Sequence, residues 1–249
     1  NNIMLSRYGL RVATEGVAMV HNLILGAFTM VGSGVDNWVD GREQRRYTPY
    51  HIRHRTEVAG MMTILHGDNR FYNNIFVQGH PITNEEPKES PFHQQVGTHV
   101  WDEYPAYKEW IAKFDMEEEK PDMGKLEPAH FGHLPVWADG NVYLAGAKAW
   151  KKEKHNLVKD DADVQIELLE EDGQYRLSTN LYDYLDGFTT GIINSDILGK
   201  AFEPEQRFEE RDGSDIVFQS DYLGNHRGVS TIPGPFADVK ELDEVIWID

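Results

Sequence analysis

Short apolar triplets that follow an asparagine recur along the chain and give the sequence its main pattern. The matching strings are Asn1-Asn2-Ile3-Met4-Leu5, His21-Asn22-Leu23-Ile24-Leu25, Asn73-Asn74-Ile75-Phe76-Val77 and Gly140-Asn141-Val142-Tyr143-Leu144. Asn2 and Asn22 are 20 residues apart, close to one coil of a parallel β-solenoid, in which each repeat covers the apolar face of its neighbour. We therefore predict an all-β fold, a right-handed parallel β-helix with loop insertions and a β-rich C-terminal part.

The repeated asparagine is suited to a corner of such a coil. Asparagine tolerates left-handed backbone geometry, and its side-chain amide can hydrogen-bond an asparagine stacked on the next coil. We expect residues 1–80 to form these coils through short strands divided by glycine, asparagine and charged residues. The expected strands in the first part are Ile3–Leu5, Leu10–Ala13, Val17–Val20, Leu23–Ala27 and Thr29–Val31.

An insertion at residues 33–57 interrupts the repeat. Asn22 and Asn74 are 52 residues apart, so we expect this interval to hold one further coil and about a dozen extra residues. The insertion combines aromatic, histidine and charged residues, and a long polar loop on a rigid scaffold is a typical place for a binding site. We expect it to line the pocket through Asp36, Tyr50, His51, His54 and Glu57.

The remaining chain divides by composition into two parts. Residues 81–134 are rich in proline and charge, which predicts a surface excursion, solvated or packed against the coils or another subunit, with a short helix over 101–114. We expect a homo-oligomer. Residues 135–249 return to β patterns, including a hairpin turn at Glu171-Asp172-Gly173. These patterns fit either terminal coils or a separate small sandwich.

The composition narrows the function classes. The 42 acidic and 24 basic side chains give a net charge of −18, which argues against non-specific binding to nucleic acid or an anionic membrane. Cysteine is absent, so a thiolate metal site is excluded, and the cellular compartment stays open. Six Trp, eleven Tyr and eleven Phe are more informative, because aromatic rings beside carboxylates are what sugar-binding clefts use.

Several acidic and histidine residues are candidates for chemistry. Glu15 precedes a glycine and an apolar strand, where burial between coils would raise its pKa as a general acid requires, although a glutamate before a glycine is usually a surface turn residue and spacing alone does not select it. Asp36 and Asp68 fit turn positions, and Glu57 is placed to pair with a neighbouring arginine. The histidines lack a metal-ligand spacing, and no phosphate-binding loop or nucleophile elbow is present, so we expect neither metal nor cofactor.

Six strings in the first 78 residues together resemble the glycoside hydrolases of family 120, the β-xylosidases built on a right-handed parallel β-helix. They are Ala13-Thr14-Glu15-Gly16, Val20-His21-Asn22-Leu23, Val31-Gly32-Ser33-Gly34-Val35-Asp36-Asn37, Arg46-Tyr47-Thr48-Pro49-Tyr50-His51, Ile64-Leu65-His66-Gly67-Asp68 and Phe71-Tyr72-Asn73-Asn74-Ile75-Phe76-Val77-Gln78. The segments 202–208 and 233–236 also resemble sequences of this family.

The resemblance implies exo-acting, retaining hydrolysis of short xylo-oligosaccharides by an aspartate nucleophile and a glutamate acid/base. The acid/base maps best onto Glu15. The nucleophile, one coil earlier, would fall before Asn1, so we expect a partner, an N-terminal polypeptide of the same enzyme, to carry it.

Two alternatives remain open from the residues alone. A β-helix polysaccharide lyase could use the basic cluster at 42–55 to neutralise a uronate and supply an arginine base. A non-catalytic solenoid would bind oligosaccharide without turning it over. A lyase would release an unsaturated, ultraviolet-absorbing sugar, and a hydrolase would not.

Overall fold

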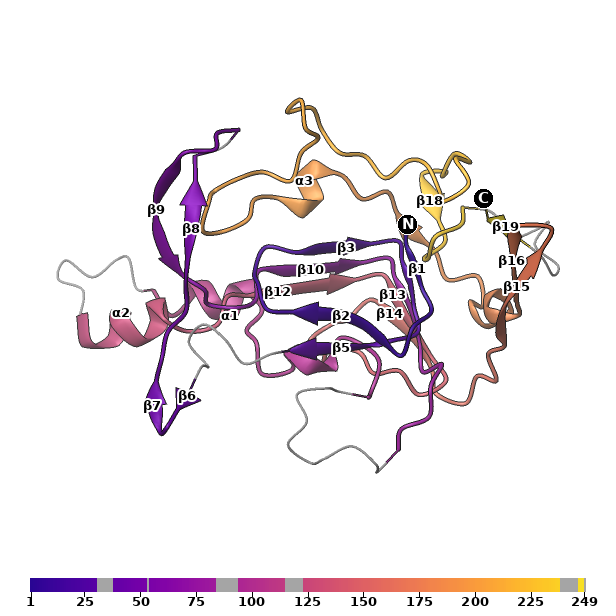
Figure 1. Ribbon diagram of the computed structural model, residues 1–249, viewed down its shortest axis with the longest axis horizontal. Helices are drawn as coiled ribbons and strands as arrows, with labels where there is room; N and C mark the ends of the chain where they lie inside the picture. The colour runs from indigo at the N-terminus through magenta and orange to yellow at the C-terminus, as the bar shows by residue number, and fades with distance from the viewer. Residues whose placement is uncertain (31–37, 53, 84–93, 115–122, 238–245, 249) are drawn as a thin grey trace.

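The computed structural model describes residues 1–30, 38–52, 54–83, 94–114, 123–237 and 246–248 of the chain. This part is all-β, as predicted, with few and short helices (Figure 1). The α-helices are α1 (Tyr107–Ile111), α2 (Met123–His130) and α3 (Ser195–Leu198), and 3-10 turns lie at His99–Trp101 and Leu181–Tyr184.

A five-stranded sheet in which every pairing is parallel runs through the molecule. Its strands, in spatial order, are β1 (Ile3–Met4), β4 (Leu23–Ile24), β11 (Ile75–Val77), β13 (Asn141–Leu144) and β14 (Asn156–Lys159). The apolar triplets identified in the sequence therefore stack directly on one another. Their paired residues form a column of Ile3, Leu23, Ile75, Val142 and Leu157.

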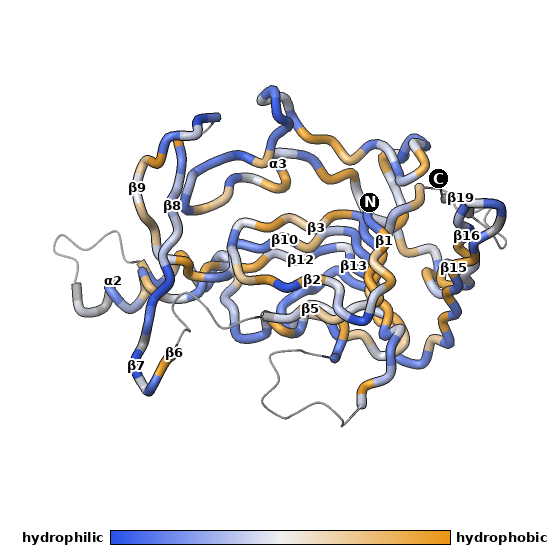
Figure 2. The backbone as a smooth tube through the Cα atoms, viewed as in Figure 1, coloured by the Kyte–Doolittle hydropathy of each residue, from blue (hydrophilic) through white to orange (hydrophobic). Residues whose placement is uncertain are grey.

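Two further parallel sheets are built from the same passes of the chain. One has the order β12 (Val136–Asp139), β10 (Asn69–Tyr72) and β3 (Ala18–Val20), and the other pairs β2 (Tyr8–Val12) with β5 (Ala27–Met30). Each pass up to β13 thus adds a strand to more than one sheet, whereas the last adds only β14. The spacing between stacked strands is about 4.8 Å. In Figure 2 hydrophobic stretches on these strands, such as those of β3 and β12, alternate with hydrophilic ones, such as that of β10.

The prediction of an extra coil between Asn22 and Asn74 is wrong. Leu23 pairs directly with Ile75, and Met19 of β3 pairs with Phe71 of β10, so these two passes are immediate neighbours. The additional residues instead leave the stack as two antiparallel hairpins. These are β6 (Trp38–Val39) with β7 (Arg42–Glu43), and β8 (Tyr47–His51) with β9 (Val58–Thr63).

The repeated asparagines form the predicted ladder. Asn2 Nδ2 donates to Asn22 Oδ1 over 2.8 Å, Asn22 Nδ2 to Asn74 Oδ1 over 2.7 Å, and Asn74 Nδ2 to Asn141 Oδ1 over 2.9 Å. The ladder ends on a carboxylate, because Asn141 Nδ2 donates to Glu153 Oε1 over 2.8 Å. The backbone N–H of each ladder asparagine donates to the same oxygen as its side-chain amide does. Every step of the ladder therefore contains two hydrogen bonds.

Left-handed geometry falls one residue before the ladder asparagines, not on them. His21, Asn73 and Gly140 have φ values of 56°, 57° and 71°. At position 140 a side chain would also clash, because a Cβ there would lie 2.3 Å from Oδ1 of Asn73. The ladder residue itself keeps ordinary backbone geometry and turns its amide inward.

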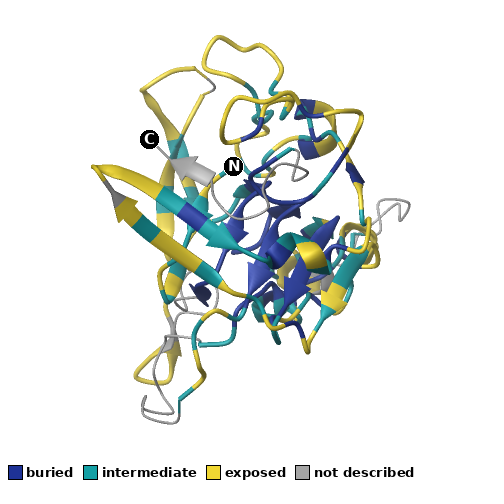
Figure 3. Ribbon diagram, turned by 90° about the vertical axis from the view of Figure 1, so that its right-hand side faces the viewer, coloured by how far each residue is buried: buried dark blue, intermediate teal, exposed yellow. Residues whose placement is uncertain are grey.

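The alternation along the five-stranded sheet divides the core into two buried clusters. Ile24 and Phe76 face the space between the parallel sheets, whereas Leu23 and Ile75 face the outer side. That outer side is covered by the C-terminal part of the chain through Leu181 and other apolar residues. Figure 3 shows the stacked strands as the buried centre, with more exposed hairpins around it.

The segment after residue 94 is not simply a solvated surface excursion. Trp101 is completely buried, with its ring centroid 4.6 Å from that of Phe71 and 5.6 Å from that of Phe28. The expected single helix over 101–114 is replaced by a 3-10 turn and α1, which Pro105 separates. This segment therefore closes one open side of the parallel sheets.

The C-terminal part first continues the parallel sheets and then changes to antiparallel pairing. The strands β12, β13 and β14 continue the parallel stacks, and antiparallel pairing begins after them. A three-stranded antiparallel sheet has the order β15 (Ile166–Glu171), β16 (Gln174–Thr179) and β19 (Ile246–Ile248), and β17 (Thr190–Gly191) pairs with β18 (Ser230–Thr231). The turn predicted at 171–173 is confirmed, with φ values of 53° at Asp172 and 82° at Gly173.

Candidate active site

Glu15 lies in a cavity of about 410 Å³ that three separate segments enclose. The first is the bend at residues 13–16 between β2 and β3, and the second is the β8–β9 hairpin, through Arg46, Thr48 and Met62. The third is the segment 201–204 after α3, which contributes Glu203. The insertion singled out in the sequence therefore does form one wall of the cavity.

The Glu15 carboxyl is partly buried and held by the neighbouring pass of the chain. Glu15 pairs with Gly67 in an isolated parallel bridge, and its Oε2 accepts a hydrogen bond from the backbone N–H of Leu65 over 2.8 Å. Its Oε1 is buried and has no hydrogen-bond partner among the described residues. Burial raises the pKa of Glu15 to about 7, and the charges of Glu203 and Asp68 act in the same direction.

Asp68 reaches the same cavity but has a different environment. Its φ of 54° agrees with the predicted turn position, and the residue is only 1% exposed. Arg70 Nη1 donates to Asp68 Oδ1 over 2.8 Å, and the backbone N–H of Phe202 donates to Oδ2 over 2.7 Å. Burial raises the pKa of Asp68, and the Arg70 guanidinium partly offsets this effect. Both oxygens are thus engaged, which ties the 201–204 segment to the parallel sheets.

Glu203 is a site residue that the sequence did not single out. It lines the Glu15 cavity and also an adjoining cavity of about 350 Å³ that contains Tyr50. Burial raises the pKa of Glu203, the charge of His130 lowers it, and the charge of Asp68 raises it again. Three carboxyl groups therefore surround one small space, beside the guanidinium-bearing side chain of Arg46.

The other predicted substrate-binding residues lie at different distances from the cavities, and only some of them line one. Tyr50 packs over Gly60 and lines the adjoining cavity. His51 and Glu57 are exposed near the end of the β8–β9 hairpin, where the His51 ring donates from Nδ1 to the backbone carbonyl of Glu57 over 3.0 Å, and neither is among the residues that line the Glu15 cavity. Asp36 lies outside the described residues.

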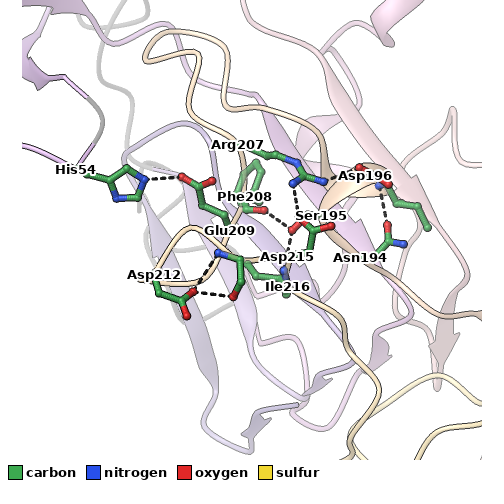
Figure 4. A network of polar contacts seen from close by, with 12 residues as sticks. His54, Asn194, Ser195, Asp196, Arg207, Phe208, Glu209, Asp212, Asp215 and Ile216 are labelled. Carbon is green, nitrogen blue, oxygen red and sulfur yellow. Dashed lines mark hydrogen bonds and ion pairs between the residues drawn. The ribbon is translucent and has the colours of Figure 1, made fainter.

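His54 connects the hairpin to the C-terminal part of the chain. Its Nε2 lies 2.9 Å from Oε1 of Glu209 (Figure 4). The segment that carries Glu209 is itself fixed, because Arg207 forms ion pairs with Asp196 and Asp215. His54 thus joins the β8–β9 hairpin to the chain that follows the 201–204 segment, although neither His54 nor Glu209 is among the residues that line the Glu15 cavity.

Within the described residues, no group of three or more His, Cys, Asp or Glu side chains is arranged to hold a metal ion. The helices of the described chain are all too short or too polar to span a bilayer.

These features define an all-β protein with stacked parallel sheets and a cavity surrounded by carboxyl groups. The chain is similar to XylC, whose structure was solved in complex with xylose, with 29% sequence identity and a TM-score of 0.77. The likeness covers 99% of this chain and 34% of the XylC chain, so this chain spans about a third of the length of that protein. No family model matches the sequence, and no curated protein matches it.

Proposed function

We propose that this chain carries the acid/base, Glu15, of a xylose-acting glycoside hydrolase, and that the enzyme is a retaining, exo-acting β-xylosidase. The observation that carries the proposal is the Glu15 carboxyl itself. It lies in a cavity of a suitable size for a sugar, and its pKa is raised to about 7, where a carboxyl can both donate and accept a proton. The likeness to XylC supports xylose as the sugar.

The scaffold for this chemistry is proposed to be a right-handed parallel β-helix. Three parallel sheets, an in-register column of apolar residues and the asparagine ladder support it. Stacked strands lie about 4.8 Å apart, so carboxylates on adjacent passes fall close to the separation of about 5–5.5 Å that a retaining mechanism uses.

In the first step, Glu15 donates its proton to the glycosidic oxygen while an aspartate attacks the anomeric carbon. In the second step, the Glu15 carboxylate removes a proton from the water that releases the xylosyl group from that aspartate. The nearby Glu203 and Asp68 charges favour the protonated form of Glu15 before the first step. Arg46 and Glu203 supply a donor and an acceptor for sugar hydroxyls.

The aspartate nucleophile is proposed to come from a further pass of polypeptide that pairs with β1 and β2. Both strands are at the edges of their sheets within the described chain, since β1 pairs with β4 and β2 with β5. Asp68 is less suited to attack, because Arg70 and the Phe202 N–H already engage its two oxygens.

The test uses the complete enzyme with Glu15→Ala. Turnover of xylobiose should fall by about 10² to 10⁴-fold, because its leaving group needs a proton. An aryl xyloside with a good leaving group should keep its glycosylation rate, and azide should restore its turnover. Glu210→Ala, which removes an exposed glutamate, should leave both activities unchanged. Equal loss on both substrates without rescue would contradict the assignment.

The lyase alternative is less consistent with the charge of the cavity. Glu15, Asp68 and Glu203 line it together, and Arg46 is the basic residue in the lining. A uronate carboxylate would meet like charges there. Release of an ultraviolet-absorbing unsaturated sugar by the complete enzyme would favour the lyase, and retained sugar binding without turnover would favour a binding module.

A further inference from the structure

A second cavity of about 420 Å³ lies on the other side of the wall formed by Asp68 and Ala201, which line both cavities. It is formed by α1, by the ends of β10 and β12, and by the segment from α3 to Phe202. The two spaces are therefore neighbours that the same short segment of chain separates. The proposed reaction at Glu15 makes no use of this second cavity.

The strongest charge in the second cavity is already neutralised. Arg70 donates from Nε to the carbonyl of Leu198 and from Nη2 to the carbonyl of Lys200, and it forms the ion pair with Asp68. Its guanidinium carbon also lies 4.3 Å from the ring centroid of Trp137. Arg70 is thus fully engaged and is not available as an anion site.

The remaining charged residues of the lining have opposite signs. Lys200 and Glu205 are both exposed, and their charges cancel, so the cavity does not select for a charged ligand. The two side chains provide N–H donors and carboxylate acceptors at the edge of the space. A neutral ligand that carries several hydroxyl groups matches this combination.

Aromatic rings form much of the remaining lining. Tyr107 is 49% exposed, and its ring lies 6.1 Å from that of Trp137 with an angle of 26° between the planes. Trp110 and Phe202 meet edge to face with centroids 4.9 Å apart. Exposed aromatic faces next to polar groups suit a pyranose ring, which has apolar faces and hydroxyl edges.

We propose that this second cavity binds one pyranose unit of a neutral xylo-oligosaccharide, with Tyr107 as the stacking residue and Glu205 as a hydroxyl acceptor. The choice of sugar rests on the proposed function, whereas the preference for a neutral polyhydroxylated ring rests on the lining. The site is separate from the Glu15 cavity, because Asp68 and Ala201 lie between the two.

Tryptophan fluorescence can distinguish the two cavities, because Trp110 and Trp137 line the second and, among the described residues, none of those that line the first is a tryptophan. The experiment titrates the complete enzyme carrying Glu15→Gln, which prevents hydrolysis, with xylotriose and follows tryptophan fluorescence. A saturable change is expected. Adding Tyr107→Ala should weaken the apparent affinity at least tenfold, and adding Tyr107→Phe, which keeps the ring, should preserve it.

A matched control is Tyr175→Ala in the same background, since Tyr175 is 44% exposed on β16, outside both cavities. Its affinity should not change. Adding Glu205→Gln should weaken binding by a smaller factor than Tyr107→Ala. A titration without a saturable change, or one that Tyr107→Ala leaves unaltered, would overturn the proposal.

Hydrolysis of xylobiose by the enzyme with an intact Glu15 separates the two proposals. Turnover without Tyr107-dependent binding would reject the second site and keep the proposed function. Tyr107-dependent binding without turnover would keep the sugar site and reject the hydrolase. A titration with xylose in place of xylotriose shows whether one sugar unit is sufficient for binding.

Discussion

The backbone N–H of Leu65 donates to Oε2 of Glu15 over 2.8 Å, although 50 residues separate the two positions in the chain. This hydrogen bond anchors the carboxyl to the neighbouring pass, while the buried Oε1 has no hydrogen-bond partner among the described residues. The backbone N–H groups of Leu65 and His66 stabilise the charged form less than burial destabilises it, and the pKa of Glu15 therefore rises to about 7. The same pairing that stacks the passes thus positions the carboxyl to which the proposed mechanism assigns proton transfer.

The pKa of Glu15 predicts the basic limb of the pH profile. A general acid must be protonated, so kcat/KM for xylobiose should fall as the pH rises through about 7. Glu203→Gln removes a negative charge that raises this pKa, and the limb should move to lower pH. The measurement is kcat/KM against pH for both enzymes. A limb that stays in place after Glu203→Gln would show that Glu203 does not act on Glu15.

Glu153 should make folding stability depend on pH. Burial raises its pKa from 4.5 to about 7, against the opposing effect of hydrogen bonds from Tyr143 and Asn141. The folded state then binds the proton more tightly than the unfolded state. The contribution of Glu153 to the free energy of unfolding is therefore largest below pH 4.5 and decreases as the pH rises to about 7. The loss is on the order of 3 kcal/mol. The measurement is the free energy of urea unfolding as a function of pH. Glu153→Gln should make it less dependent on pH between 4.5 and 7, and an unchanged pH dependence would contradict the assignment.

Asn74→Ala should destabilise the chain strongly. Asn74 is fully buried, its Oδ1 accepts two N–H groups of Asn22, and its Nδ2 donates to Asn141 and to the carbonyl of Met19. Removal of the amide leaves several buried groups without partners, at a cost of about 3 kcal/mol or more. Asn156→Ala is the control, because Asn156 pairs in register with Asn141 but is partly exposed. Similar unfolding midpoints for the two variants would show that the ladder contributes little.

His54→Ala should affect catalysis more than stability. Because His54 is half exposed, its contact with Glu209 contributes about 0–1 kcal/mol, and the melting temperature should change little. The hairpin wall of the cavity loses its connection to the C-terminal part, and KM for xylobiose should rise by a few-fold. Glu57→Ala, on the same hairpin, should leave KM unchanged because Glu57 does not line the cavity. A lower melting temperature with normal kinetics would make His54 purely structural.

The sequence was sufficient to predict the stacking of the asparagine strings. Their polarity repeats in every copy, and the physical requirement behind it, a buried amide that needs an identical partner, is local to each string. The same local view failed for the interval between Asn22 and Asn74. A regular 20-residue period implied another coil there, but the residues instead pair with each other as antiparallel hairpins.

The site was only partly predictable, because its residues come from distant segments. Glu15 and the insertion around Tyr50 could be chosen from motif and composition. Glu203 could not, since it reaches the cavity through the hydrogen bond from Phe202 to Asp68, which spans 134 residues. Trp101 gave no signal of burial either, because Asp102 and Glu103 follow it directly and its partners Phe28 and Phe71 lie far away in the sequence.

The carboxylate at the end of the asparagine ladder gives the stack a direction. The side-chain amide of each asparagine donates a hydrogen bond to the next residue of the ladder, and Glu153 Oε1 accepts the last of these bonds. Tyr143 donates to the other carboxylate oxygen of Glu153 over 2.6 Å. A carboxylate has no N–H group and cannot donate a further hydrogen bond of this kind. Both N–H groups of the Asn141 amide are already engaged, by Glu153 and by the carbonyl of Phe71. Asn156, which pairs in register with Asn141 on β14, therefore receives no hydrogen bond from that amide, and the ladder ends one strand before the described parallel sheet does.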